Sequence, residues 1–508
     1  MDLNKRVVLE PNLSDSTNGL IKELNDTLMQ VYSGTKIENI LEALYDSSID
    51  IHNVGDERVF KSINTQMCDA INTVNAAIPN CELYGLKIDK NNSDPSTRIT
   101  YISTCDNANF TPASANGTSL NLHEWADAWF VKGNYPCLLS FDGKTETRLN
   151  PNDYTKTTSG AASNVTSTSA AGNFMAVIPL VWVKFDEDNN YEYIYISNIK
   201  YDDDFQAIAH TRSDGVIVSK IYMSMFRGYV TGNKMRSIAN VIPSGNNTAQ
   251  QEVTYAQANN PSGIAATTRL QSSGGTCDGW YTWTWGQYML LTVLCLFIGK
   301  SDDSQAVFGN GILDASSVCM CGHNGTDTSA TSTLNKGQFY GDRSGATVHV
   351  RVFHIEDPWG NQWNRIAGLI NNYGQILVKF HGPYNYDGAG YDTVYIKDQS
   401  ISKYSQAWST TGKELKYEAA LLGYIGHTYM TKWGRFPKDT TGSSSTFCCD
   451  GYGIVLSGTD FGGNYFTKAY PICGGAIGNG MMDGGYFLAY DHSIYDINRG
   501  FGCALSYI

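Results

Sequence analysis

The stretch from Leu421 to Ile508 contains three segments that show neither a helical nor a strand period: Cys448-Cys449-Asp450-Gly451-Tyr452, Gly462-Gly463-Asn464-Tyr465-Phe466 and Gly484-Gly485-Tyr486-Phe487-Leu488-Ala489-Tyr490. So many glycines lose much backbone entropy on folding, and the stretch therefore needs a packed scaffold to hold it. Its mixture of Tyr, Ser, Gly and Asn is typical of surfaces that bind ligands, because rigid aromatic rings stand beside adaptable polar groups. Two interpretations follow, a displayed binding surface or an irregular β domain rich in Tyr and Gly.

The composition favours a β-rich protein with an uncharged polar surface. The chain has 508 residues, of which 42% are hydrophobic and 17% are charged, and its net charge is −13. This length predicts two or three domains. Ser, Thr, Asn, Gly and Tyr must cover most of the surface, which suits an assembled or extracellular protein better than a cytosolic helical enzyme. Because no run of Lys and Arg is present, we expect no nucleic-acid partner.

The longest apolar run, from Tyr288 to Ile298, is too short to span a bilayer and predicts a buried helix within Tyr281 to Phe297. Met1 to Lys5 lead into polar residues rather than into an apolar signal segment, so we expect synthesis in the cytoplasm and no membrane insertion. The 12 cysteines show no regular spacing, and we expect most of them to be reduced and buried.

Residues 1–80 are expected to be helical and to assemble the chain into an oligomer. Ile21, Leu24, Leu28 and Val31 form one narrow apolar seam, and a longer helix is expected from about Glu57. Such seams are too narrow to make a core alone, and they are typically buried against symmetry mates. We therefore expect a homo-oligomer, in the simplest case a trimer, with an intramolecular three-helix bundle as the alternative.

From Cys81 onward, short β segments alternate with turns. The segments at 83–88 and 98–102 have a period of two, and those at 177–183 and 191–196 predict a hairpin. A stretch rich in Thr, Ser, Ala, Gly and Asn at 155–172 predicts a surface loop or a linker. We therefore expect the α+β class and three parts: residues 1–80 as a helical anchoring segment, 81–170 as a β-rich connector and 171–508 as a ligand-binding domain.

Several motifs resemble the tail- or fibre-type proteins of phages and prophages of gut bacteria. The resemblance rests most clearly on Tyr84-Gly85-Leu86-Lys87-Ile88-Asp89-Lys90-Asn91-Asn92-Ser93-Asp94-Pro95 and on Trp359-Gly360-Asn361-Gln362-Trp363-Asn364-Arg365-Ile366-Ala367-Gly368. It covers about residues 81–508. The C-terminal half resembles the C-type-lectin-like domain of these proteins, a variant shared with ligand-binding proteins that retroelements diversify. The resemblance thus implies a C-type-lectin-like domain after the helical segment and the connector.

In that family the final segment, here about 484–506, is the displayed surface, although its frequent Ala-Gly-aromatic step is replaced here by Gly484-Gly485-Tyr486. The resemblance implies that the backbone is held by small and apolar residues while polar and tyrosine side chains point outward. The expected ligand-binding residues are Tyr486, Tyr490, Asp491, His492, Tyr495, Asp496 and Asn498, completed by Asp460, Phe461, Asn464 and Tyr465. The closely spaced ligands of metal-dependent lectins have no match, so no metal or cofactor is expected.

Other candidate sites are weaker. Cys319, Cys321 and His323 offer zinc ligands but have no fourth ligand at regular spacing, so we expect no metal there. The acidic runs at 186–188 and 202–204 are expected to be solvated turns rather than Ca²⁺ loops. His349, His354 and His381 are expected to be structural, and no motif of a hydrolase, a metalloprotease or a phosphate loop is present.

The resemblance implies a non-enzymatic protein of the virion surface, made in the host cytoplasm. Residues 1–80 would bind other virion proteins, and the C-terminal domain would bind a glycan or protein of the bacterial surface. One alternative is a capsid decoration or head fibre protein in which receptor binding is not essential. A second alternative is a glycan depolymerase, for which the chain has many carboxylates to supply an acid and a base.

Overall fold

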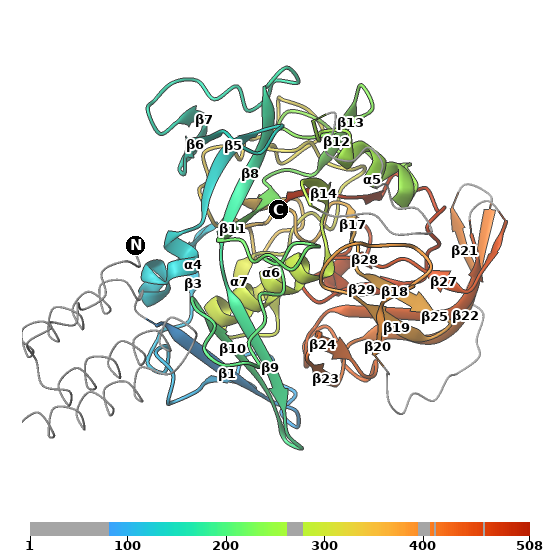
Figure 1. Cartoon of the computed structure of the whole chain (residues 1–508). Helices are drawn as coiled ribbons and strands as arrows, with labels where there is room; N and C mark the ends of the chain where they lie inside the picture. The colour runs from blue at the N-terminus through green and yellow to red at the C-terminus, as the bar shows by residue number, and fades with distance from the viewer. Residues whose placement is uncertain (1–80, 262–277, 395–406, 411–412, 461–462) are drawn as a thin grey trace, which may run out of the picture. The chain divides into compact units, whose positions relative to one another are not determined.

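The computed structural model describes residues 81–508 except 262–277, 395–406, 411–412 and 461–462. Within it, residues 82–508 form one compact unit (Figure 1). The helices expected in residues 1–80 lie outside the described residues. In the part that is described, 35% of the residues lie in strands and 11% in helices. The expected α+β class is therefore wrong, and the described chain is mostly β.

Four short α-helices and two 3-10 turns accompany the strands in the described residues. They are η1 (His123–Asp127), α4 (Trp129–Lys132), α5 (Ala249–Gln257), α6 (Trp285–Gly299), α7 (Ser304–Phe308) and η2 (Gly480–Met482). No helix in this part of the chain combines the length and the apolar character needed to cross a membrane.

A four-stranded antiparallel sheet has the order β2-β1-β10-β9. Its strands are β1 (Leu83–Asp89), β2 (Ile99–Tyr101), β9 (Trp182–Glu187) and β10 (Tyr191–Ser197). The period of two in the sequence places Leu86, Ile194 and Val183 on its buried face. The predicted hairpin is confirmed for β9 and β10, whereas residues 177–179 belong to a strand of the next sheet.

A seven-stranded sheet has the order β14-β31-β11-β8-β5-β6-β7. Its strands are β5 (Tyr135–Ser140), β6 (Glu146–Asn150), β7 (Asp153–Thr157), β8 (Gly172–Pro179), β11 (Lys220–Ser224), β14 (Trp280–Thr282) and β31 (Leu505–Tyr507). Because β5 pairs with β8, the expected boundary at residue 170 has no counterpart in this sheet. The last strand of the chain, β31, lies between β14 and β11 and is therefore an internal strand.

The C-terminal part contributes an eight-stranded sheet in which β21-β22-β25-β29-β28-β17-β30 are neighbours in that order and β26 pairs with β25. Its strands are β17 (Trp363–Arg365), β21 (Ala407–Thr410), β22 (Lys413–Tyr424), β25 (Gly451–Thr459), β26 (Tyr465–Phe466), β28 (Ile472–Cys473), β29 (Leu488–Tyr490) and β30 (Phe501–Gly502). A further sheet, β20-β19-β18-β27, consists of β18 (Leu369–Asn372), β19 (Gln375–Val378), β20 (Asp392–Val394) and β27 (Lys468–Ala469).

Four two-stranded ribbons complete the described strands. They are β3 (Ser114–Asn116) with β4 (Ser119–Asn121), β12 (Gly228–Thr231) with β13 (Lys234–Ser237), β15 (Arg351–Val352) with β16 (Ile355–Glu356), and β23 (Thr428–Thr431) with β24 (Gly434–Pro437).

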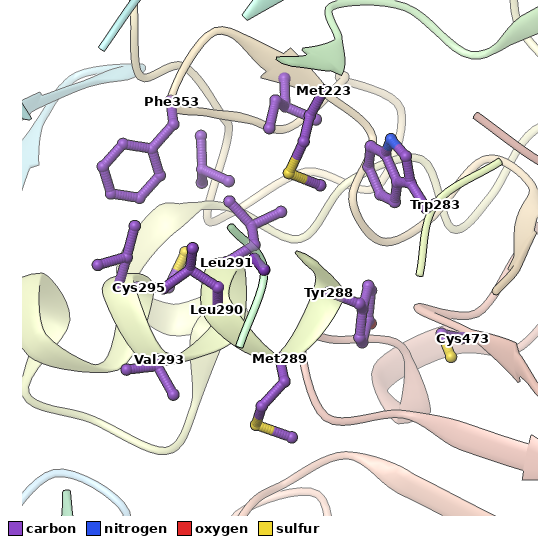
Figure 2. Packing of buried hydrophobic residues seen from close by; sticks show 14 of the residues in the cluster. Met223, Trp283, Tyr288, Met289, Leu290, Leu291, Val293, Cys295, Phe353 and Cys473 are labelled. Carbon is purple, nitrogen blue, oxygen red and sulfur yellow. The ribbon is translucent and has the colours of Figure 1, made fainter. Parts of the chain in front are cut away.

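The predicted core helix is confirmed as α6, and every one of its residues is buried. Its first turn is closed by a capping box, in which Gln287 N donates to Thr284 Oγ1 and Thr284 N donates to Gln287 Oε1. Figure 2 shows its side chains in the core, together with Met223 and Phe353 from distant parts of the chain. Because α6 is apolar on every side, each side must pack against other apolar residues. Buried residues from many parts of the described unit belong to the same core cluster as α6.

The segment from 349 to 371 is buried at every residue, although much of it is polar. Its polar groups are paired inside the protein: Trp359 Nε1 donates to Gly309 O at 3.0 Å, and Asn361 Nδ2 donates to Asp357 Oδ2 at 2.9 Å. Left-handed backbone at Asp357 and Asn361, with φ of 53° and 61°, turns the chain inside the core. The motif that carries the family resemblance is thus an internal support and not a surface.

Candidate ligand-binding surface

The Gly-rich terminal segment is built into the sheets. β29 lies between β25, to which it is parallel, and β28, to which it is antiparallel. β30 runs parallel to β17, and β31 closes the seven-stranded sheet. Most residues of 484–508 are buried, so most side chains of this segment point into the protein.

Tyr490 is 1% exposed, so the expectation that it binds a ligand at the surface is wrong. Its ring packs edge-on against Tyr452, with 6.3 Å between the ring centroids. Its carbonyl accepts a hydrogen bond from Asn371 Nδ2 at 3.2 Å. Tyr486 is also buried, and the guanidinium of Arg435 lies 5.1 Å from its ring. A period of two predicts alternate outward side chains only when one face of the strand meets water.

His492 and Asp496 are also buried, contrary to the expectation that they face a ligand. His492 Nδ1 lies 3.2 Å from Asp496 Oδ2, and the same oxygen accepts from Ser493 N at 2.9 Å. The imidazole of His492 packs on the ring of Phe501, with the centroids 4.5 Å apart. These side chains close a turn and are not available to a ligand.

Asp460 is buried and serves the turn before β26. Its Oδ1 accepts from Asn464 N at 2.8 Å, which holds Asn464 at the surface. The expected role of Asp460 as a ligand contact is therefore replaced by a structural one. Phe461 lies outside the described residues.

Tyr465 and Tyr495 do lie at the surface, with 69% and 63% of their area exposed. Asn464 is exposed as well, while Asp491 and Asn498 are half-buried. These five are the expected ligand-binding residues that are not fully buried, although Oδ1 of Asp491 is enclosed near His492.

Two exposed residues nearby were not expected, Tyr373 at 52% and Ile497 at 48% exposed. Tyr373 and Gly374, with φ of 49° and 85°, form the two-residue turn between β18 and β19. The sequence signal that would have found Tyr373 is an Asn-Tyr-Gly turn between two apolar strands. We use the name tyrosine surface for Tyr373, Asn464, Tyr465, Asp491, Tyr495, Ile497 and Asn498.

Backbone hydrogen bonds connect the three segments that make up the tyrosine surface. Tyr373 N donates to Thr467 O at 2.8 Å, which joins the β18–β19 turn to the segment after β26. Tyr470 N donates to His492 O at 2.9 Å, which joins β27 to the loop that bears Tyr495. Tyr373 and Tyr465 therefore stand on backbone that paired strands hold, while Tyr495 stands in the turn between β29 and β30.

One cluster in the described residues has the composition of a metal site, namely His349, Glu356 and Asp357, all fully buried. His349 Nδ1 lies 2.7 Å from Asp357 Oδ2, and Nε2 lies 2.7 Å from the carbonyl oxygen of His323. Both ring nitrogens face acceptors, so both carry hydrogen and neither has a lone pair for a metal. Burial lowers the pKa of His349, but the charges of Asp357 and Glu356 outweigh it and raise the pKa to about 9. The cluster is an ion-pair network that supports the buried segment.

Other candidate metal ligands are also accounted for. Cys319, Cys321 and His323 are buried, and they do not form a group of metal ligands in the part of the chain that the structure describes. In the exposed acidic run, Asp204 pairs with Lys184 at 2.7 Å and Asp203 pairs with Lys200 at 2.6 Å. These observations agree with the expected solvated turns.

Comparison with known proteins adds no relative. No model of a protein family matches the chain, and no curated protein matches it either.

Proposed function

We propose that this chain is a non-enzymatic binding protein on the surface of a tailed phage and that it attaches the particle to a glycan or protein of the bacterial surface. The observation that carries the proposal is the exposure of two tyrosines, Tyr465 in the strand β26 and Tyr495 in the turn between β29 and β30. The motif resemblance and the low charge of the chain support the same function.

The chemistry of the tyrosine surface suits such a ligand. Each ring offers a flat apolar face and a hydroxyl tip, which stack on a sugar ring or fill a shallow protein pocket. Asn464, next to Tyr465 in the chain, adds the carbonyl oxygen of its side-chain amide, while its Nδ2 donates to Asp460. A backbone that is ordered before binding loses little entropy when the ligand arrives.

Weak single sites suffice if several copies act together. In the proposal, residues 1–80 join the chain into a homo-oligomer, in the simplest case a trimer, and fix it to other virion proteins. Linked sites raise the overall affinity by about 10²- to 10⁴-fold over a single site, provided that they reach the same surface.

The test is adsorption of particles that carry the double variant Tyr465→Ala/Tyr495→Ala. If each ring contributes about 1.4 kcal/mol, each loss lowers single-site affinity about tenfold, and adsorption should fall strongly. Tyr201→Ala is the matched control, because Tyr201 is 43% exposed and lies outside the tyrosine surface. Normal adsorption of the double variant, with an unchanged melting temperature, would contradict the proposal.

A second function, capsid decoration or a head fibre, is favoured by one observation. Residues 484–508 supply β29, β30 and β31 to two sheets, so this segment is part of the framework. In that case, particles lacking the chain should adsorb normally but lose resistance to heat or low salt. Under the adhesin proposal, the same particles should fail to adsorb.

A further inference from the structure

Asp450 and Asp483 are two fully buried carboxylates in the C-terminal part of the unit. Asp450 directly precedes β25, and Asp483 directly precedes Gly484, ahead of β29. Neither was singled out as a candidate by the sequence, since Asp next to Gly normally marks an exposed turn.

Glycine backbone surrounds both carboxylates closely. A Cβ atom on Gly484 would lie 1.9 Å from Asp450 Oδ1, and one on Gly475 would lie 1.6 Å from Asp483 Oδ1. Both glycines have positive φ, at 157° and 78°, so no other residue fits there without strain or overlap. Three turns of the chain, at 450, 474–476 and 483–485, thus meet around the two side chains.

Most of the carboxylate oxygens have no hydrogen-bond donor. Asp450 Oδ2 accepts from Tyr486 N at 2.7 Å. Asp450 Oδ1 has no hydrogen-bond donor among the described residues, and the two oxygens of Asp483 have at most a poorly formed one, from Ala476 N. Buried oxygens without partners are rare in folded proteins and destabilise them, so each requires an explanation.

The nearby arginines are occupied by other acids. Arg435 binds Glu192 at 2.8 Å and Asp302 through two nitrogens, and Arg98 binds Asp302 at 3.0 Å. Arg435 therefore offsets the charge of Asp450 only in part.

We infer that Asp450 and Asp483 bind a hard divalent cation, best matched by Ca²⁺, together with backbone carbonyl oxygens of the surrounding turns. Carboxylate and carbonyl oxygens are the donors that Ca²⁺ prefers, and it accepts the irregular geometry of loops. Mg²⁺ fits less well, because it keeps several waters and both carboxylates are fully enclosed by protein. A cation here fixes the turns that lead into β25 and β29 and so supports the strands beneath the tyrosine surface.

The experiment uses the purified full-length chain. Elemental analysis after extensive dialysis should find about one Ca²⁺ per chain. Removal of the metal with a chelator should lower the melting temperature by about 5 °C, and added Ca²⁺ should restore it where Mg²⁺ does not. Absence of a bound divalent cation, together with a melting temperature that ignores chelator and Ca²⁺, would overturn the inference.

Asp483→Asn and Asp450→Asn are the decisive variants, since an amide keeps the shape and removes the charge. Each should lose the Ca²⁺ and the response to chelator. Asp203→Asn, in the exposed acidic run, is the matched control and should retain both. If Asp483→Asn keeps its Ca²⁺, Asp483 is not a ligand and the inference is overturned. It is also overturned if neither protein contains metal and the variant has the higher melting temperature, because the wild-type carboxylates would then be protonated. If the variants fail to fold, the chelator and Ca²⁺ measurements on the wild-type chain still show whether a divalent cation is bound.

Discussion

The imidazole Nδ1 of His349 lies 2.7 Å from Oδ2 of Asp357 in a position that water does not reach. The pair lies at the start of the buried segment 349–371, which turns through left-handed backbone at Asp357. A charged hydrogen bond in such a place holds a strained turn that apolar contacts alone would not specify.

This pair predicts that the protein loses stability at alkaline pH. The pKa of His349 rises from 6.5 to about 9 in the folded state, because Asp357 and Glu356 outweigh the effect of burial. The protonated ring therefore stabilises the fold fully below pH 6.5, and this contribution disappears as the pH rises through about 9. The free energy of unfolding, measured with urea, should fall across this window by an amount on the order of 3 kcal/mol.

Two histidine variants separate this effect from general alkaline unfolding. His349→Gln should be less stable than the wild type at neutral pH. Its free energy of unfolding should fall much less between neutral pH and pH 9. His123→Gln changes an exposed residue, and its free energy of unfolding should depend on pH as in the wild type. Parallel curves for His349→Gln and the wild type would show that the imidazole is not charged.

Arg435 predicts a large loss of stability when it is replaced. Its guanidinium pairs with Glu192 and Asp302, and all three side chains are 1% exposed or less. Arg435→Met would leave Glu192 buried without a counter-charge and Asp302 with Arg98 alone, which costs about 3–5 kcal/mol of unfolding free energy. Lys200→Met breaks an exposed pair with Asp203 and should leave the unfolding curve unchanged. Equal effects of the two substitutions in urea titrations would argue against a buried network.

Local patterns in the sequence were sufficient for some elements. The apolar run behind Thr284 and Gln287 predicted α6, and alternation predicted the β9–β10 hairpin. In both cases the signal lies within about 20 residues, where side-chain period and caps determine the structure.

Long-range pairing was not predictable in the same way. β31 pairs with β11, so Ser506 lies beside Met223, and nothing near either residue specifies that partner. The burial of 349–371 was missed for a related reason: Asn361, Gln362 and Asn364 look like surface residues until their backbone partners are known. For the candidate site, the sequence found Tyr465 and Tyr495 but could not separate them from Tyr490, since the burial of Tyr490 against Tyr452 depends on tertiary structure.

That difference between tyrosines predicts opposite outcomes for two substitutions. Tyr490→Ala removes a buried ring that packs against Tyr452 and should lower the free energy of unfolding by about 3–5 kcal/mol. Tyr495→Ala removes an exposed ring and should change it by less than about 0.5 kcal/mol. Thermal melts followed by near-ultraviolet circular dichroism would compare them. A stable Tyr490→Ala protein would place that ring at the surface after all.

Gly172 predicts that one methyl group is enough to disturb the seven-stranded sheet. A Cβ atom there would lie 1.9 Å from Leu139 O in the neighbouring strand β5, so β8 and β5 would have to separate. Gly172→Ala should therefore lower the free energy of unfolding by about 1–3 kcal/mol. Gly453 is the matched glycine of β25, because its Cβ atom would meet only Leu422 Cδ1 at 3.4 Å, an ordinary contact. Gly453→Ala should be neutral or stabilise by up to about 1 kcal/mol, since alanine restricts the unfolded chain. Urea titrations of both variants at one pH decide the matter, and equal stability would mean that β5 and β8 are not adjacent at Gly172.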